Sequence, residues 1–519
     1  MRCAPLLLLL IGNLVAFAPA PTELLVHAGT QKIANAAPAE VNDDADSLED
    51  DSKDLNTGDE DDSAEEDADP AGEDSLDTAD SSSQDTAFEE AYSPDTTGND
   101  SLDDDSLDED SSGMEPFVAI PPVDMFTADS ALLFPEEGIT DTTMPEELRR
   151  PIRVGILPGV SRADIGGGDS VLVSFNGEPF EAHSPDISVS RSGSKVTFRD
   201  ASGFHRSADS LTIAPADTSE ASRLCVSDKK YRGALTAILV RGHLTIVNDV
   251  NVEDYVKGVI PYEIGRLGES FIDALKAQAV AARTYAYHHY NSRRSQGFDV
   301  YPNVRDQVYN GIAGESTWSN AAVDSTAGVV LTYEGKFIEA YYHSTCGGHT
   351  DNVDTWGLRP APYLKAVPDL QPNRRPWCSG SNYSHWTWKI SDKEMAKIIR
   401  KNFSKKSPKS KFKTIKSISV RGQLAGGRVR AVTVKTDKGS LTIRGDKTRW
   451  MFRRGSRILP SSRFSISKSG NSWVIHGTGF GHGIGMCQMG ARARAQAGQD
   501  YKEILKHYYP TITLMRLVP

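Results

Sequence analysis

The chain has 519 residues and a formal net charge of −14, and its 5 cysteines are too few for a disulfide-rich scaffold of this length. The charge is unevenly distributed, because residues 41–110 contain 30 acidic residues and a single basic residue, Lys53. Residues 111–519 carry 54 basic and 39 acidic residues, a net charge of +15. The sequence therefore joins an acidic segment to a basic body, whose surface should attract polyanions.

Residues 1–30 have the pattern of an export signal. Arg2 provides the positive start, and residues 6–17 form a short apolar core that small residues follow. Pro19 interrupts the apolar run, so we expect a cleaved signal, with an uncleaved signal anchor as the alternative. No later segment is apolar for long enough to cross a bilayer. The predicted location is extracytoplasmic (periplasm, cell wall or secreted), which argues against nucleic acid as the partner of the basic body.

Residues 31–112 are rich in Asp, Ser, Ala and Thr and poor in aromatic residues. Such a segment buries too little apolar surface to offset its chain entropy, so we expect it to be disordered. A linker is expected over 113–150, with order beginning near Pro151. The folded part is then 151–519, with a β-rich portion at about 151–250 and the candidate catalytic residues in the portion from about 250 to 519.

The predicted elements follow in chain order. Short strands are expected at 152–157, 170–175, 195–198, 210–213, 235–240 and 243–248. A long helix follows to about Tyr290, with Ser270 as its cap and Asp273 completing a capping box. The pattern then predicts a hairpin at 329–342, a helix at 391–402, a β-rich stretch at 412–476, and helices at 486–497 and 500–508. The expected fold class is α+β: a β-rich, multi-lobed body with one long central helix, preceded by the disordered acidic segment.

Three segments combine polar residues and glycines in unusual ways. The first is VEDYVKGVIPYEI at 252–264, followed by ALKAQAVAARTY at 274–285. The second is HSTCGGHT at 343–350, and the third is GTGFGHGIGMCQMGA at 477–491. The alternating glycines of the third segment do not follow the dinucleotide-binding spacing, and no strand, helix and acidic residue of a βαβ unit surround them.

Taken in this order, the three segments resemble the stage II sporulation protein D family, whose relatives include amidase-enhancer proteins. The resemblance runs from about residue 152 to the C-terminus, and it includes YRG at 231–233 and the stretch at 443–464. It implies a protein that acts on peptidoglycan, because some members are lytic transglycosylases that cleave glycan strands and others enhance a partner amidase. We therefore expect a lytic transglycosylase, with a non-catalytic amidase enhancer or wall-binding protein as the main alternative and a zinc-dependent amidase as a weaker one.

Glu263 is the candidate catalytic residue, at the position where the resemblance places the family's glutamate. We expect it in a short loop after Pro261, where its apolar neighbours could raise the pKa of the carboxyl group. Lytic transglycosylation needs one acid/base, whereas hydrolysis usually needs two carboxylates. The alternative is a surface glutamate that caps the next helix.

Gln278, Arg283 and Tyr285 are candidate substrate-binding residues on the predicted long helix. A buried arginine needs a partner, so Arg283 is expected either to pair with a loop carboxylate or to orient substrate. A purely structural ion pair is the alternative.

His343, Cys346 and His349, with Cys378 further along the chain, offer imidazole and sulfur ligands that suit a structural zinc ion. Some relatives in the resembled family bind zinc near this segment. A Cys346–Cys378 disulfide is the competing interpretation for an exported protein. A glycine-rich substrate loop with free thiols is a further alternative, and the proposed chemistry requires no cofactor.

His482 and Gln488, in the third segment, can donate hydrogen bonds to hydroxyl or acetamido groups, and the glycines around them allow a ligand close to the backbone. The alternative is a tight loop in which His482 is structural. Cys487 stands where relatives in the resembled family often have serine, so we expect no catalytic role for its side chain.

Overall fold

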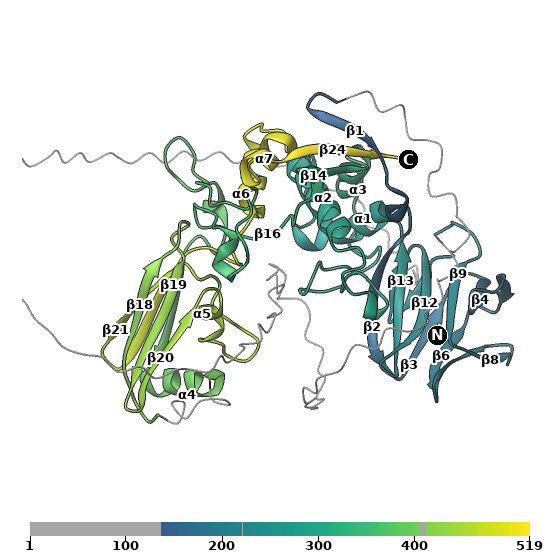
Figure 1. Ribbon diagram of the computed structural model, residues 1–519, viewed down its shortest axis with the longest axis horizontal. Helices are drawn as coiled ribbons and strands as arrows, with labels where there is room; N and C mark the ends of the chain where they lie inside the picture. The colour runs from purple at the N-terminus through teal and green to yellow at the C-terminus, as the bar shows by residue number, and fades with distance from the viewer. Residues whose placement is uncertain (1–135, 221, 404–411) are drawn as a thin grey trace, which may run out of the picture. The chain divides into compact units, whose positions relative to one another are not determined.

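The computed structural model describes residues 136–220, 222–403 and 412–519 (Figure 1). The predicted signal peptide (1–30), the acidic segment (31–112) and most of the predicted linker (113–150) lie outside these residues. Among the described helices, none has both the length and the apolar composition that a membrane span requires.

The described chain is ordered before Pro151, contrary to expectation. Strand β1 (Ile139–Thr143) pairs in parallel with the C-terminal strand β24 (Thr513–Val518). Arg516 of β24 also binds Glu136, with 3.1 Å between Nη2 and Oε2. The local sequence could not predict this strand, because its partner lies at the other end of the chain.

Two six-stranded antiparallel sheets form the first part of the fold. One has the order β2-β13-β12-β9-β4-β5 and the other β11-β10-β3-β6-β7-β8. Their strands are β2 (Ile152–Val160), β3 (Arg162–Gly166), β4 (Val171–Phe175), β5 (Glu181–His183), β6 (Ile187–Ser192), β7 (Lys195–Asp200), β8 (His205–Ala208), β9 (Ser210–Pro215), β10 (Leu224–Val226), β11 (Lys229–Tyr231), β12 (Ala234–Val240) and β13 (His243–Val250). Alternate residues point into the core, as Val196 and Phe198 of β7 do, each fully buried. All six predicted strands are confirmed, and most of those not predicted have only three to five residues.

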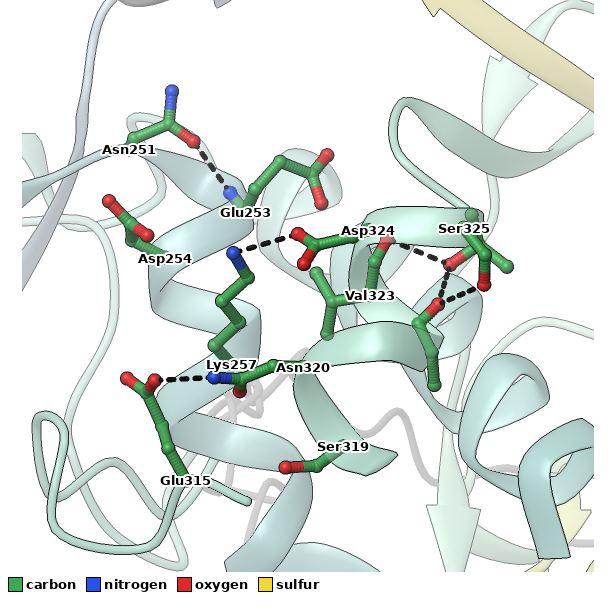
Figure 2. A network of polar contacts seen from close by, with 12 residues as sticks. Asn251, Glu253, Asp254, Lys257, Glu315, Ser319, Asn320, Val323, Asp324 and Ser325 are labelled. Carbon is green, nitrogen blue, oxygen red and sulfur yellow. Dashed lines mark hydrogen bonds and ion pairs between the residues drawn. The ribbon is translucent and has the colours of Figure 1, made fainter. Parts of the chain in front are cut away.

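A group of packed helices follows the sheets. Helix α1 (Val252–Glu263) begins at Asn251, whose Oδ1 accepts a hydrogen bond from the backbone N–H of Glu253 at 2.8 Å (Figure 2). It packs against α2 (Ile272–His288) and α3 (Thr317–Ser325). An ion pair of 2.7 Å between Lys257 Nζ and Asp324 Oδ1 joins α1 to α3 (Figure 2).

Helix α2 differs from the predicted long helix in two respects. A 3-10 turn over Glu269–Phe271 precedes it, so Ser270 does not cap it, and no side chain accepts a capping hydrogen bond there. Asp273 instead accepts from the backbone N–H of Tyr501 at 3.3 Å. The expectation of one long central helix is also not met, since α2 has 17 residues and is one of seven α-helices in the described residues.

The C-terminal elements return to these helices. The predicted hairpin is confirmed as β14 (Val329–Tyr333) and β15 (Lys336–Phe337), which join β24 and β1 in a four-stranded sheet. Helices α6 (Gln488–Gln496) and α7 (Tyr501–Tyr508) are also as predicted. A short parallel pair, β16 (Tyr342–His343) with β23 (Met486–Cys487), brings the second and third sequence segments together.

The described residues of the stretch 386–477 build a second hydrophobic core, which includes Val432, Val434 and Ile475, all fully buried. The predicted helix and β-rich stretch are seen as α4 and two three-stranded sheets, β17-β22-β21 and β18-β19-β20. Their elements are β17 (Trp386–Ser391), α4 (Asp392–Phe403), β18 (Ile415–Gln423), β19 (Val429–Thr436), β20 (Gly439–Arg444), α5 (Lys447–Trp450), β21 (Phe464–Ser469) and β22 (Ser472–Gly477). The described residues therefore form a β-rich α+β protein with two separate cores.

Candidate active site

Glu263 is the last residue of helix α1, not a loop residue as expected. Its side chain points into the protein and the residue is only 2% exposed. Val259, Ile260 and Ile264 beside it are also buried, because the C-terminal turn of α1 lies within the main core. The alternative of a surface glutamate capping the next helix therefore does not describe this residue.

The two carboxyl oxygens of Glu263 have different surroundings. Oε1 accepts a hydrogen bond from the backbone N–H of Val308 at 2.8 Å. Oε2 is buried and has no hydrogen-bond partner of normal geometry among the described residues. Burial raises the pKa of Glu263 to about 8, while the Val308 N–H and the side chains of Gln488 and Tyr342 act in the opposite direction. The carboxyl group thus holds a proton near neutral pH.

A group of buried polar side chains extends from this carboxyl group. The Nε2 group of Gln488 donates to Oε1 of Gln278 at 3.4 Å, and Gln278 is fully buried on α2. The Nε2 group of Gln307 donates to the hydroxyl of Tyr342 at 3.0 Å, and its Oε1 accepts from Tyr255 at 3.0 Å. Tyr342 and Gln307 were not predicted, although Tyr342 directly precedes the second sequence segment.

Arg283 and Tyr285 bind other parts of the fold. Arg283 is fully buried and pairs with Glu253 at the start of α1, with distances of 2.8 and 2.5 Å. Its Nη1 group also donates to the carbonyl of Val329 at 3.0 Å. The hydroxyl of Tyr285 donates to Oδ1 of Asp306 at 3.1 Å. These contacts tie α2 to its neighbours and direct neither side chain to Glu263.

His482 is 1% exposed, and both ring nitrogens bind the backbone. Nδ1 accepts from the N–H of Ile484 at 3.1 Å, so Nε2 carries the proton and donates to the carbonyl of Tyr342 at 2.9 Å. Burial, followed by the nearby Arg449 and Arg428, lowers the pKa of His482 to about 3, so the ring is neutral. His482 therefore holds the backbone of Tyr342 in place instead of presenting a free donor.

The predicted ligands His343, Cys346, His349 and Cys378 are only partly brought together. The sulfur atoms of Cys346 and Cys378 are 3.6 Å apart, and both cysteines are free. The Nδ1 atom of His343 lies 3.1 Å from the carbonyl of Ile484, and that of His349 lies 2.8 Å from the carbonyl of Thr350. Cys346 and Cys378 instead lie with Asp369 and Cys487, so the histidine-containing donor set does not fit this structure.

Comparison with known proteins agrees with the sequence resemblance. The family model described as stage II sporulation protein matches residues 240–333, and a domain of unknown function matches 378–485. Stage II sporulation protein D of Bacillus amyloliquefaciens is 31% identical over 284 residues, which cover 52% of this chain and 75% of that protein. The chain belongs to the stage II sporulation protein D family.

Two further relatives extend this comparison. An uncharacterized protein of Brachyspira hyodysenteriae is 37% identical over 290 residues, which cover 55% of this chain and 72% of that protein. The amidase enhancer of Bacillus subtilis is 32% identical over 341 residues, which cover 59% of this chain. The matched part spans 47% of the enhancer's own length.

Proposed function

We propose that this protein is an extracytoplasmic lytic transglycosylase that cleaves peptidoglycan glycan strands, with Glu263 as its single acid/base. The observation that carries the proposal is the buried Glu263 carboxyl group, whose Oε2 has no hydrogen-bond partner of normal geometry among the described residues and whose pKa is raised to about 8. A carboxylic acid that keeps its proton at neutral pH can act as a general acid.

The chemistry requires one proton to be given and one to be recovered. Protonated Glu263 donates its proton to the glycosidic oxygen as the bond from that oxygen to the anomeric carbon breaks. The 6-hydroxyl of the same sugar then attacks the anomeric carbon, and Glu263 takes the hydroxyl proton. The products are a free 4-hydroxyl on one strand and a 1,6-anhydro ring on the other, and no water is consumed. The N–H of Val308 at Oε1 would stabilise the carboxylate formed between the two steps.

The surroundings of Glu263 favour this reaction over hydrolysis. Hydrolytic glycosidases usually place a second carboxylate near the first, to activate water or to act as nucleophile. The groups that act on the Glu263 carboxyl group are the Val308 N–H and the side chains of Gln488 and Tyr342, and none of these is a carboxylate. Since Glu263 is 2% exposed, a glycan can reach it only when the side chains that cover it move.

The test is digestion of purified sacculi, with and without amidase pretreatment, followed by mass spectrometry of the released fragments. The wild-type protein should release anhydro-muropeptides, and Glu263→Gln should not. Glu269→Gln, which changes an exposed glutamate in the neighbouring 3-10 turn, is the matched control and should retain full activity. Equal release by the wild-type and Glu263→Gln proteins would refute the acid/base role.

A second candidate function is non-catalytic enhancement of an amidase, which the similarity to an amidase enhancer favours. In this case neither the wild type nor Glu263→Gln would release fragments alone. Both would increase, to the same extent, the peptide release by an added amidase. The same digestion experiment therefore separates the two functions.

A further inference from the structure

Four potential metal ligands from separate parts of the chain meet in the interior. They are Cys346, Asp369, Cys378 in the 3-10 turn Trp377–Gly380, and Cys487 at the start of α6. One ligand atom from each residue lies within 4.8 Å of the other three. All four residues are at most 1% exposed. We call them the Cys-Asp cluster.

Two distances within the Cys-Asp cluster are close to the edges of a small coordination tetrahedron. Zinc binds sulfur at about 2.3 Å and carboxylate oxygen at about 2.0 Å, so a tetrahedral site separates two sulfurs by about 3.8 Å and a sulfur from an oxygen by about 3.5 Å. The Cys346 and Cys378 sulfurs are 3.6 Å apart, and the Cys346 sulfur lies 3.2 Å from Oδ2 of Asp369. An iron–sulfur cluster needs wider spacing, because several metal atoms and sulfides lie between its protein ligands.

Backbone N–H groups surround the sulfur atoms. The Cys487 sulfur accepts from the N–H of Cys346 at 3.2 Å and from that of Gly490 at 3.3 Å. The Cys346 sulfur accepts from the N–H of Gly348 at 3.2 Å. Such donors stabilise sulfur atoms that carry negative charge, and the start of α6 adds the positive end of a helix dipole.

Asp369 is oriented by partners outside the cluster. Its Oδ1 accepts hydrogen bonds from Nη2 of Arg494 and from the hydroxyl of Tyr508, both at 2.9 Å. These partners leave Oδ2 directed toward the Cys346 sulfur. A carboxylate held in this way by a second layer of hydrogen bonds is typical of a metal ligand.

We propose that Cys346, Asp369, Cys378 and Cys487 form a structural zinc site. A zinc ion would replace the thiol protons of the three cysteines and bind four ligand atoms that the fold already holds close together. Four protein ligands leave no open coordination position, so the site stabilises the fold and does not activate water. It cross-links the second sequence segment to the start of α6, next to Gln488, and it does not depend on the proposed function.

The test is the zinc content of the full chain, purified without chelators and measured by elemental mass spectrometry. About one zinc per chain is expected, and Cys378→Ser and Cys487→Ser should lower this content at least about 10-fold. His343→Gln and His349→Ala are matched controls, because these histidines lie outside the cluster, and both should keep the zinc. Loss of zinc from either histidine variant to the same extent as from Cys487→Ser would overturn the assigned ligand set.

A second measurement on the wild-type chain covers the case in which a cysteine variant does not fold. Cobalt bound in place of zinc should give thiolate-to-metal charge-transfer absorption. Chelation should lower the thermal midpoint, and added zinc should restore it. A wild-type protein that contains no zinc and yields a Cys346–Cys378 disulfide in unreduced peptide maps would overturn the proposal in favour of the disulfide.

Discussion

Gln488, the first residue of α6, donates a side-chain hydrogen bond to Gln278 on α2, and 210 positions separate the two residues in the sequence. The amide nitrogen of Gln488 has two hydrogens, so it can donate both to Gln278 and to the Glu263 carboxyl group, whose pKa it lowers. The pair therefore connects the third sequence segment to the candidate acid/base of the first.

Replacement of Gln488 by leucine removes a donor that favours the ionised form of Glu263. We expect the pKa of Glu263 to rise further, so the alkaline limb of anhydro-muropeptide release should move to higher pH. The maximal rate should fall about 10-fold, equivalent to about 1.4 kcal/mol of transition-state stabilisation. Release measured from pH 5 to pH 10 checks this. Gln496→Leu, at the exposed end of α6, is the control and should change neither the alkaline limb of the pH profile nor the maximal rate. An alkaline limb that does not move in Gln488→Leu would contradict the contact between Gln488 and Glu263.

The raised pKa of Glu263 also predicts a pH dependence of stability. From the ordinary pKa of 4.5 up to about 8, the unfolded chain loses this proton while the folded chain keeps it, so stability falls as pH rises across this window. Glu263→Gln removes this effect. At pH 9 the variant should be more stable than wild type by about 2 kcal/mol or more, and the difference should be much smaller at pH 5.

Denaturant unfolding at the two pH values measures this difference. Glu269→Gln, whose side chain is exposed, should show no such difference between pH 5 and pH 9. A Glu263→Gln protein whose stability changes with pH in parallel with wild type would show that Glu263 ionises normally.

The ion pair between Arg283 and Glu253 should matter mainly for stability. Arg283→Met removes the buried donor to both carboxyl oxygens of Glu253 and to the carbonyls of Val329 and Val323, and we expect it to lower the free energy of unfolding by about 3 kcal/mol. Lys257→Met removes the more exposed pair with Asp324 (Figure 2) and should cost less than about 1 kcal/mol. Thermal unfolding checks both values. The activity of Arg283→Met should fall only in proportion to the fraction of the variant that is unfolded. A larger loss of anhydro-sugar release would instead indicate a role of Arg283 in substrate binding.

Substitutions at Gly485 and Gly498 distinguish two energetic costs of adding a side chain, which are backbone strain at a positive φ angle and steric overlap with a neighbouring atom. Both have positive φ angles, +70° and +87°. A Cβ at Gly485 would overlap the carbonyl oxygen of Tyr341, whereas a Cβ at Gly498 would have no atom within 4 Å. We expect Gly498→Ala to cost about 1 kcal/mol and Gly485→Ala about 3 kcal/mol or more, measured by chemical unfolding. Equal costs would show that the contact with Tyr341 relaxes freely.

Local patterns predicted a large part of this molecule. The six strands between 152 and 248, the hairpin after Val329 and the helices near the C-terminus depend on residues close together in the sequence, so alternation and helical spacing predict them. The capping of α2 was predicted wrongly, because the Asp273 carboxylate binds the backbone of Tyr501, more than two hundred residues away.

By itself, the sequence determined the family, the β-rich class and the identity of Glu263 as a candidate, since motifs and periodicity are properties of neighbouring residues. Only the tertiary structure decided that Glu263 ends a buried helix, that Tyr342 and Gln488 approach it, and that Cys346 lies with Asp369, Cys378 and Cys487. The physical reason is that desolvation and ligand geometry depend on every group packed around an atom, and most of those groups come from distant parts of the chain.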